Sequence, residues 1–446
     1  MKLPEKPNFE SRDMLAKLLN QDNSILILQF LADYDSELNK AIKKAINNYE
    51  YWDSVKYYQI PENITPEQFW ALINLQKSSI STKQINMGGQ KFKILETASI
   101  QKKLSIIDRH FSKYNLTTEE SNEYSVNSLM EEGIASSQLE GAAVTREIAK
   151  EMLRTNSLPK SRDEQMILNN YKAMEYIDTK CGDVLSPDKI KNIHKIITEK
   201  TLENEEKAGT FRSNEDNVRV VDSRDNTLLF DPPKADNIEQ MLEQLCAYAN
   251  KNDEDDFVHP AIKAIVIHFW LAYIHPFIDG NGRTARALFY WYMLKSGYKS
   301  FKYLVVSRVL KEKPAQYARA YLYSEYDNND LTYFINFNLD IILEAIKHFD
   351  EYVEKKKEEN KKTAYLIEQD IELNFRQRSI MKTFLKDRNV RNIEYFKNTL
   401  NVAYETTRKD LDFLVKKGFL SKSKKIKQFV YSISNKLKEK LENNNI

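Results

Sequence analysis

The sequence predicts a mainly α-helical, globular protein. Two features of its composition indicate helices, and a third indicates a globular chain. Gly and Pro, the residues that most often interrupt helices, are scarce, at 10 and 11 of 446 residues. Long stretches are rich in Leu, Ile, Glu and Lys, which favour helices. Hydrophobic residues make up 41% and charged residues 30% of the chain, which is the balance of a globular protein. The length of 446 residues predicts two or three domains.

Membrane proteins and disulfide-rich proteins are excluded by the same sequence. No apolar run reaches the ~20 residues that a membrane-spanning helix needs, and the N-terminus lacks the apolar core of a signal peptide. Two cysteines, Cys181 and Cys246, are too few for a disulfide framework or a cysteine-rich metal cluster. We therefore expect a cytoplasmic protein with no membrane contact and no targeting segment.

Helix start and stop residues give the order of the elements before the C-terminal part. Residues 1–115 are expected to form an N-terminal helical region, with helices at Ser11–Leu19 and Thr65–Lys77 and a turn at Asn86–Gln90. The second helix begins with Thr-Pro-Glu, a strong start signal. Further helices are expected, in chain order, at Ser125–Glu140, Thr145–Thr155, Asp163–Tyr176, Ser186–Ile197, Ala235–Ala249, Ala261–Ile274 and Gly282–Ser296.

A short β-hairpin is expected at Val218–Phe230. Two runs of strand-favouring residues, VRVV and TLLF, flank the polar sequence DSRDN, which suits a turn. An Asp-Pro-Pro sequence follows and ends the strand pattern.

The C-terminal residues differ from the rest of the chain in charge. Residues 376–446 contain 18 Lys and Arg against 7 Asp and Glu, although the net charge of the whole chain is only +2. A highly charged segment at 351–375, expected to be an exposed linker or helix, separates them from residues 116–350. Charge divided in this way indicates parts with different partners.

Residues 376–446 show the order of elements of a winged-helix domain. Three short helices are expected at Ser379–Leu385, Asn392–Leu400 and Tyr404–Lys417, followed by two strands around a basic turn at Lys422–Lys427. Such a domain binds duplex DNA, mostly through phosphates, or serves as a protein-docking or dimer module, and the sequence leaves these partners open. The residues expected on its recognition helix are Thr406, Thr407, Arg408 and Lys409.

The most informative segment is HPFIDGNGRTAR at residues 275–286, which lies between two expected helices. Gly280 and Gly282 flank Asn281 in a chain that uses little glycine, so the backbone here can approach a ligand closely. Exposed N–H groups at the start of a helix bind anions. The segment therefore predicts a phosphate-binding loop, although Gly-Asn-Gly alone is more often an ordinary turn.

Four charged or titratable side chains accompany this loop. Arg283 and Arg286 are three residues apart and share a helix face, where they can bridge further phosphates. Asp279 offers one oxygen ligand, too few for a protein-only metal site but typical of Mg²⁺ held partly by nucleotide phosphates. His275, with the ordinary pKa near ~6.5, can accept a proton at neutral pH. Together these residues indicate phosphoryl or nucleotidyl transfer to a hydroxyl group.

The same segment resembles the signature HPFxDGNGRxxR of Fic-domain proteins, and every fixed position is present. The resemblance covers roughly Thr117–Asp350. It implies an all-helical Fic core with one β-hairpin flap. It also implies an activity that transfers AMP from ATP, with Mg²⁺, to a Ser, Thr or Tyr hydroxyl of a target protein.

The resemblance further implies a role for each residue of the segment. His275 would deprotonate the target hydroxyl, and Asp279 would bind Mg²⁺. The stretch Gly280–Gly282 would hold the α- and β-phosphates of ATP. Arg283 would hold the β-phosphate region and Arg286 the γ-phosphate.

A second element of the family pattern lies upstream, in SSQLEG at residues 136–141. It fits the inhibitory pattern of the class whose inhibitory helix, here 125–141, precedes the Fic core. Ser136 and Glu140 would be the inhibitory residues, with Glu140 neutralising Arg286 so that the γ-phosphate is misplaced. In some relatives the same glutamate positions water to remove AMP, so net de-AMPylation through Glu140 is an alternative.

The resemblance also implies partner contacts. The hairpin 218–230 would be the flap, which pairs with the backbone of the target protein and presents its hydroxyl to His275. Tyr317, within Ala315–Ala318, would line the adenine pocket. An alternative to an enzyme is a DNA-binding regulator whose Fic core senses a nucleotide. Such a sensor would need the phosphate-binding loop but not His275. Homo-oligomerisation is left open by the sequence.

Overall fold

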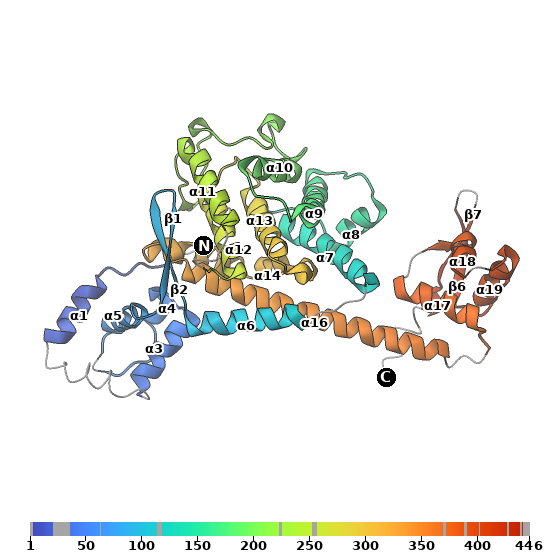
Figure 1. The fold of residues 1–446 in the computed structure, drawn as a ribbon, viewed down its shortest axis with the longest axis horizontal. Coiled ribbons are helices and arrows are strands. Elements are labelled where there is room, and N and C mark those ends of the chain that lie inside the picture. Colours follow the sequence, from blue (N-terminus) through green and yellow to red (C-terminus); the bar gives the residue numbers. More distant parts are fainter. Residues whose placement is uncertain are drawn as a thin grey trace. The chain divides into compact units, whose positions relative to one another are not determined.

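The computed structural model describes residues 3–20, 36–62, 64–113, 118–222, 225–251, 257–368, 372–387, 390–400, 402–425, 428–437 and 439. Within these ranges the chain is mainly α-helical, as predicted, with three small β-sheets. It divides into two compact units, residues 1–347 and 348–446, whose elements Figure 1 labels. The expected boundary between residues 1–115 and 116–350 lies inside the first unit and stays a prediction.

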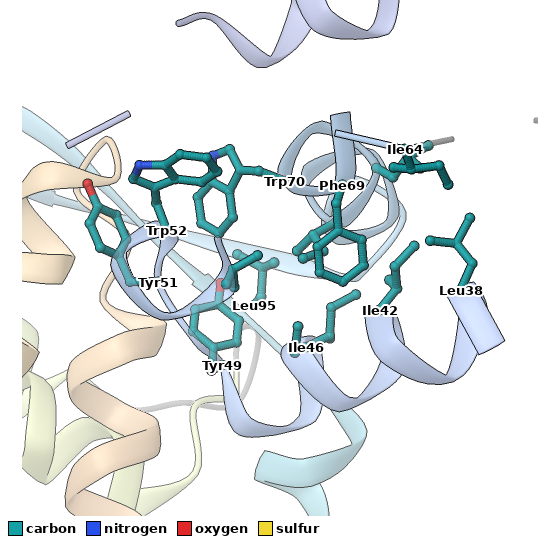
Figure 2. Packing of buried hydrophobic residues seen from close by; sticks show 14 of the residues in the cluster. Leu38, Ile42, Ile46, Tyr49, Tyr51, Trp52, Ile64, Phe69, Trp70 and Leu95 are labelled. Atoms are coloured by element: carbon teal, nitrogen blue, oxygen red, sulfur yellow. The ribbon is translucent and has the colours of Figure 1, made fainter. Parts of the chain in front are cut away.

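The N-terminal part of the first unit has its own hydrophobic cluster. Its helices are α1 (Ser11–Asn20), α3 (Glu37–Asn48), α4 (Trp52–Val55), α5 (Pro66–Lys77) and α6 (Ala98–Lys113). Side chains from α3, α4 and α5 meet in this cluster, where Ile42, Phe69 and Trp70 are almost fully buried (Figure 2). Tyr333 from α16 belongs to the same cluster, so these helices are packed onto the rest of the unit.

A β-hairpin lies where the sequence predicted a turn alone. Strand β1 (Thr82–Met87) pairs with β2 (Gln90–Leu95) through Gly88 and Gly89, whose φ angles of +57° and +84° suit glycine. Residues 329–331 continue the pairing along β2 through the backbone of Lys93. The prediction missed these strands because each is only six residues long and carries few apolar side chains, Ile85 and Met87 in β1 and Phe92, Ile94 and Leu95 in β2.

The helices that carry the motif lie at the centre of the first unit. α12 (Pro260–Ile274) is buried along most of its length and packs against α11 (Ile238–Asn250) and α13 (Asn281–Lys295). α13 also packs against α9 (Arg162–Lys180) and α10 (Pro187–Thr198) (Figure 1). None of the described helices combines the length and hydropathy needed to cross a membrane. Other described helices are α7 (Thr118–Leu139), α8 (Arg146–Thr155), α14 (Val306–Glu312), α15 (Pro314–Tyr326), α16 (Thr332–Glu368) and four short 3₁₀ helices (Glu205–Lys207, Asn214–Asp216, Ala235–Asn237 and Lys299–Tyr303).

The hairpin predicted at 218–230 is present. Val220 of β3 (Val220–Val221) pairs with Phe230 of β4 (Leu228–Phe230), and Val221 pairs with Leu228, with a register shift between the two pairs. The paired part is shorter than expected, and residues 223 and 224 of its tip lie outside the described residues.

The second unit contains the basic C-terminal elements. The predicted helices and strands are present in the predicted order, and β5 is an additional strand. The segment 351–375, expected to be a linker or helix, is helical to Glu368. Thr407, expected on the recognition helix, lies on α19 with its side chain fully buried, and the winged-helix interpretation stays a prediction. The elements are α17 (Phe375–Asp387), β5 (Arg391–Asn392), α18 (Ile393–Leu400), α19 (Tyr404–Lys416), β6 (Leu420–Lys425) and β7 (Gln428–Ile433), with strand order β5-β7-β6.

Candidate active site

Helix α12 ends because His275 turns the backbone into the left-handed region, at φ 50° and ψ 58°. This conformation is unfavourable for a non-glycine residue, and the buried side chain of Arg212 holds it in place. The Arg212 Nε donates to the His275 carbonyl (2.7 Å) and its Nη2 to the Pro233 carbonyl (2.5 Å). The Arg212 backbone N–H donates to the Pro276 carbonyl (2.9 Å). The predictions missed Arg212, since it lies 63 residues from His275 in the sequence.

The loop that follows is shaped by the side chain of Asn281. Its Nδ2 donates to the Phe277 carbonyl (2.8 Å), and its Oδ1 accepts from the Phe277 N–H (2.9 Å). Phe277 is fully buried and stacks on His194, with ring centroids 3.6 Å apart and 4° between the ring planes. The Asn281 side chain is thus engaged inside the loop, and the backbone N–H is its group suited to a phosphate.

His194 joins this loop to two other segments. Its Nε2–H donates to the Asp279 carbonyl (2.8 Å), and its Nδ1 accepts from the Gly209 N–H (2.9 Å). An accepting Nδ1 requires a neutral ring, and burial lowers the pKa of His194 to about 4. The predictions missed this residue. The available signal was a histidine on the face of α10 that carries Ile190 and Ile197.

The start of α13 offers unpaired N–H groups. Its first helical hydrogen bond runs from the Thr284 N–H to the Gly280 carbonyl (3.0 Å). The N–H groups of Asn281, Gly282 and Arg283 precede it and have no acceptor within the helix. Gly280 has a φ of +80°, and a Cβ there would come within 2.8 Å of a neighbouring threonine methyl group. The backbone here therefore has the geometry that suits an anion, and the anion site stays a prediction.

Arg283 lies under this anion site with a side chain that is 1% exposed. Its Nη2 reaches Asp279 Oδ1 at 3.4 Å and its Nη1 the Ile197 carbonyl at 3.5 Å. Its Nε is buried and has no hydrogen-bond partner among the described residues. Burial also lowers the pKa of Arg283. A buried guanidinium with two long contacts is poorly satisfied, which fits a group that binds an anion.

Asp279 is the candidate metal ligand. Its side chain is 43% exposed, and Oδ2 lies 3.6 Å from Nη2 of Arg162. No group of three His, Cys, Asp or Glu side chains in the described ranges could hold a metal ion. One accessible carboxylate beside an anion site fits Mg²⁺ that takes its other ligands from phosphates and water.

Glu140 and Ser136 both contact Arg286, whose side chain is 4% exposed. Nη2 of Arg286 donates to Glu140 Oε1 (2.8 Å) and to the Ser136 carbonyl (3.1 Å), and Nε donates to Ser136 Oγ (2.9 Å). A Cβ added to Gly282 would collide with the Glu140 carboxylate and come within 3.1 Å of Arg286 Nη1. Glu140 thus occupies the space directly against the start of α13.

Buried hydrogen bonds hold the helix that precedes Glu140. Glu132, on α7, is 2% exposed. It accepts from the Tyr290 hydroxyl (2.8 Å) and the Ser307 N–H (3.0 Å), and from the Ser307 hydroxyl. α7 ends at Leu139, and Gly141 follows with a φ of +94°. Glu140 therefore lies just beyond the anchored helix, in the turn that leaves it.

The hydrogen bond of the His275 side chain indicates which of its ring nitrogens carries the hydrogen. Nδ1 lies 3.3 Å from the Ala272 carbonyl, which can only accept, so Nδ1 carries the hydrogen and Nε2 the lone pair. Burial lowers the pKa of His275 to about 4, so the expectation of an ordinary pKa is wrong. The ring is neutral across the physiological range and can accept a proton at Nε2.

A cavity of about 260 Å³ brings these groups together. Glu140, His275, Arg286 and Tyr317 line it, and the expected contact of Tyr317 with adenine stays a prediction. The Tyr317 hydroxyl lies 2.7 Å from Nε2 of His268, so this ring is held by the core behind it. The hairpin contributes Val220, Leu229 and Phe230 to the same lining.

Several lining residues were not predicted. Tyr321, Leu322 and Glu325 follow Tyr317 along α15, and Tyr273 lies on α12. The signal for two of them, Tyr321 and Glu325, was their spacing at four-residue intervals from Tyr317, which places all three on one helix face. Such a spacing is more often part of a core, and the chain contains 25 tyrosines.

Comparisons with known proteins point to one family. A model of the Fic/DOC family matches residues 184–293. Protein adenylyltransferase Fic of Nematostella vectensis is 26% identical over 169 residues, which are 36% of this chain and 37% of that protein. Protein adenylyltransferase Fic of Drosophila grimshawi is 34% identical over 67 residues, 15% of this chain and 14% of that protein. The chain thus spans much less than half of these curated relatives.

Solved structures extend the likeness beyond the matched segment. Fic-1 from C. elegans aligns with a TM-score of 0.51 at 15% identity, over 77% of this chain and 97% of that chain. A Fic family protein from Desulfovibrio desulfuricans G20 aligns with a TM-score of 0.50 at 17% identity, over 76% and 97%. At these identities the likeness concerns the fold. Together with the matched segment, it identifies residues 184–293 as a domain of the Fic/DOC family.

Proposed function

We propose that this protein is a protein adenylyltransferase that moves AMP from ATP to a hydroxyl of a target protein and is restrained by Glu140. The observation that carries the proposal is the meeting of three groups in one cavity. These are the open N-terminus of α13, the lone pair of His275 Nε2 and the ion pair between Arg286 and Glu140. The curated relatives carry the name protein adenylyltransferase Fic.

The chemistry follows from these positions. ATP binds with its phosphates against the N–H groups that begin α13. The target hydroxyl gives its proton to Nε2 of His275 while its oxygen bonds to the α-phosphorus. The bond from that phosphorus to the bridging oxygen breaks, and pyrophosphate leaves. Asp279 would hold Mg²⁺, which neutralises phosphate charge when bound. Anionic phosphates near His275 raise its pKa from the low value set by burial, which makes it a better base.

Glu140 restrains the reaction through Arg286. Its carboxylate takes the guanidinium that the γ-phosphate needs, so ATP binds with its α-phosphorus out of line with the attacking hydroxyl. A charge-assisted hydrogen bond of this kind contributes ~1.5–3 kcal/mol, roughly ten- to a hundred-fold in the population of the competent arrangement. Ser136 adds two further contacts to the same guanidinium.

Two regions would bind partners. The hairpin of β3 and β4 lines the cavity beside His275, which suits pairing with the backbone of a target. The basic residues 376–446 supply either a DNA contact or a protein-docking surface. Arg408 on α19 is paired with Glu405 (3.2 Å) and Asp412 (3.8 Å), which reduces its availability for DNA phosphates.

The test is labelling with ATP that carries the label on its α-phosphate. Wild type should label itself and added proteins weakly, and Glu140→Gly should label them at least ten-fold more. Glu140→Gln is the matched control, because an amide keeps the size and one hydrogen bond but removes the charge, so its labelling should lie between the two. The double variant Glu140→Gly, Arg286→Ala should lose the gain. Equal labelling by wild type and Glu140→Gly would contradict the inhibitory role.

Removal of AMP is the second candidate, because Glu140 lines the same cavity as His275. A carboxylate there can orient water toward the phosphorus of an AMP group linked to a Ser, Thr or Tyr oxygen of the target, so that the bond to that oxygen breaks and AMP leaves. Proteins labelled by the Glu140→Gly variant, once purified, are the substrate for this test. Wild type should release the label and Glu140→Gly should not if de-AMPylation is the net activity.

A further inference from the structure

The cavity that holds the catalytic groups is lined mostly by apolar and aromatic side chains, among them Leu229, Phe230, Tyr273, Tyr321 and Leu322. Glu325 is a carboxylic acid in the same lining. Pockets that are apolar with one or two polar groups use those groups to orient a ligand.

The course of α15 places Glu325 away from Arg286 and Glu140, neither of which affects its carboxyl group. Tyr317, Tyr321 and Glu325 occupy one face of the helix at four-residue intervals, so Glu325 lies ~12 Å along the axis from Tyr317 at ~1.5 Å per residue. Tyr317 is close enough to Arg286 for the guanidinium charge to affect its hydroxyl. The face therefore begins beside the phosphate-binding arginine and ends at Glu325. A nucleotide bound by its phosphates at α13 would extend its base toward this carboxyl group.

The Glu325 carboxyl group is free to meet a ligand. No hydrogen bond or ion pair reaches it from the described part of the chain, and of the charged side chains Lys6 is the one that acts on it. Burial raises the pKa of Glu325 to about 8, and Lys6 lowers it by less. At neutral pH the group is therefore mostly protonated, with one oxygen that accepts and one hydroxyl that donates.

We propose that Glu325 recognises the edge of a 6-aminopurine, accepting from the exocyclic amino group and donating to the ring nitrogen beside it. This inference rests on the proposed function in one respect, namely that a nucleoside triphosphate occupies the cavity with its phosphates at α13. A pair of adjacent hydrogen bonds matches this edge, whereas a base without the amino group would leave the carbonyl oxygen of Glu325 buried and unpaired. Sites built to hydrogen-bond a ligand reject analogues that lack the group.

The experiment measures binding, by calorimetry, of ATP and of purine riboside triphosphate, which lacks only the amino group. Wild type should bind ATP at least ten-fold more tightly, which corresponds to ~1.4 kcal/mol. Glu325→Gln keeps a carbonyl and a donor of the same size and should keep this preference. Glu325→Leu should bind both nucleotides with the affinity that wild type shows for the analogue. Lys6→Met is the matched control, since it changes the charge beside Glu325 without touching the cavity lining, and should keep the preference.

The outcomes separate this inference from the proposed function. If Glu325→Leu keeps the wild-type preference, or Glu325→Gln loses it as fully as Glu325→Leu, base recognition by Glu325 is overturned while nucleotide binding stands. If wild type binds neither nucleotide, both the proposed function and this inference are overturned. Melting temperatures of the variants close to that of wild type exclude a change of fold as the cause of lost preference.

Discussion

One wall of the site is the segment His275–Arg286, of which His275, Asn281, Gly282 and Arg286 line the cavity, and a second is the face of α15 that carries Tyr317, Tyr321 and Glu325. The first wall offers unpaired backbone N–H groups and charged side chains, and buried contacts of His194 and Arg212 with its carbonyl groups support it. The second consists of aromatic rings and one carboxyl group that no described residue binds. Under the two proposals above, the rate of transfer would depend on the first wall and the choice of nucleotide on the second.

The largest expected effect concerns the first wall. His275→Ala should lower AMP transfer by ~10²–10⁴, the usual loss for a general base, and leave ATP affinity within a few-fold. The reason is that the imidazole meets the target hydroxyl and not the nucleotide. Labelling in the Glu140→Gly background and calorimetry with ATP measure the two quantities. If ATP affinity falls in parallel with transfer, His275 also contributes to nucleotide binding, and the proposed separation of roles between the two walls is wrong.

A second effect on the same wall concerns the metal. Asp279→Ala should abolish stimulation of ATP binding by Mg²⁺, because it removes the carboxylate best placed to hold the ion. Calorimetric titration of ATP with and without Mg²⁺ measures this directly. Glu164→Ala, on the exposed first turn of α9, is the control and should bind ATP as wild type does. An Mg²⁺ effect of unchanged size in Asp279→Ala would contradict the metal assignment.

A smaller effect tests the support behind the loop. His194→Phe keeps the stack on Phe277 but loses both hydrogen bonds of the imidazole. Each unpaired buried group costs ~1–3 kcal/mol, so transfer should fall about ten-fold and the Mg²⁺ concentration for half-maximal transfer should rise. His194→Gln can donate and accept at similar positions and should recover part of the loss. Equal Mg²⁺ requirements in wild type and His194→Phe would make the role of His194 purely structural.

The buried histidines also predict the dependence of stability on pH. Burial lowers the pKa to about 4 for His194 and His275 and to about 3 for His268. As pH falls below ~6.5 the unfolded chain takes up protons that the folded chain does not. Stability from these groups is complete above that pH and is lost progressively as pH falls toward 4. Glu325 changes stability in the opposite direction. Because burial raises its pKa to about 8 in the folded chain, its contribution to stability grows as pH falls below that value.

Melting curves between pH 7 and pH 5 measure this loss. Each histidine contributes up to ~1.4 kcal/mol per pH unit within the window, so the melting temperature should fall by several degrees. His268→Phe should show a shallower fall than wild type. A melting temperature that does not change over this range would mean that the three rings are solvated or already charged.

The smallest expected effect on catalysis comes from the second unit. Truncation before residue 372 should leave transfer in the Glu140→Gly background within two-fold, because the cavity-lining residues all belong to the first unit. Binding of duplex DNA by the full chain at ~50 mM salt, and its loss at higher salt, would indicate phosphate contacts by the basic residues. No shift of a DNA band at low salt favours protein docking.

The two walls also differ in how far the sequence could predict them. His275, Asp279, Gly280 and Arg286 stand in one short segment whose residue types already suggest phosphate chemistry, and His275 and Arg286 line one cavity in the structure. Tyr321 and Glu325 carry no such signal, because residues spaced by four on a helix usually belong to a core. Arg212 acts through contacts that link segments 63 residues apart, which no local pattern reveals.

Burial explains why the pKa of His275 differs from the expected value. An ordinary pKa for His275 was a reasonable expectation from sequence, but the ring is enclosed by the end of α12 and by Arg212, and both the low polarity and the nearby positive charge lower its pKa. The sequence predicted a turn at Asn86–Gln90 but not the two six-residue strands beside it, β1 and β2, which pair with each other. Helix ends with Thr or Ser caps, such as Thr65 before α5, were predicted well because the cap is local.

The contact between Gly282 and Glu140 limits how this protein could change over generations. Any side chain at position 282 would push Glu140 away and, in the same step, obstruct the start of α13 and crowd Arg286. If the proposed function holds, a mutation at 282 that removed the restraint would also remove the activity. Single substitutions at 140 or 136 would remove the restraint and keep the activity. Restraint and activity could then be lost separately through the Glu140 side of this contact, but only together through the Gly282 side.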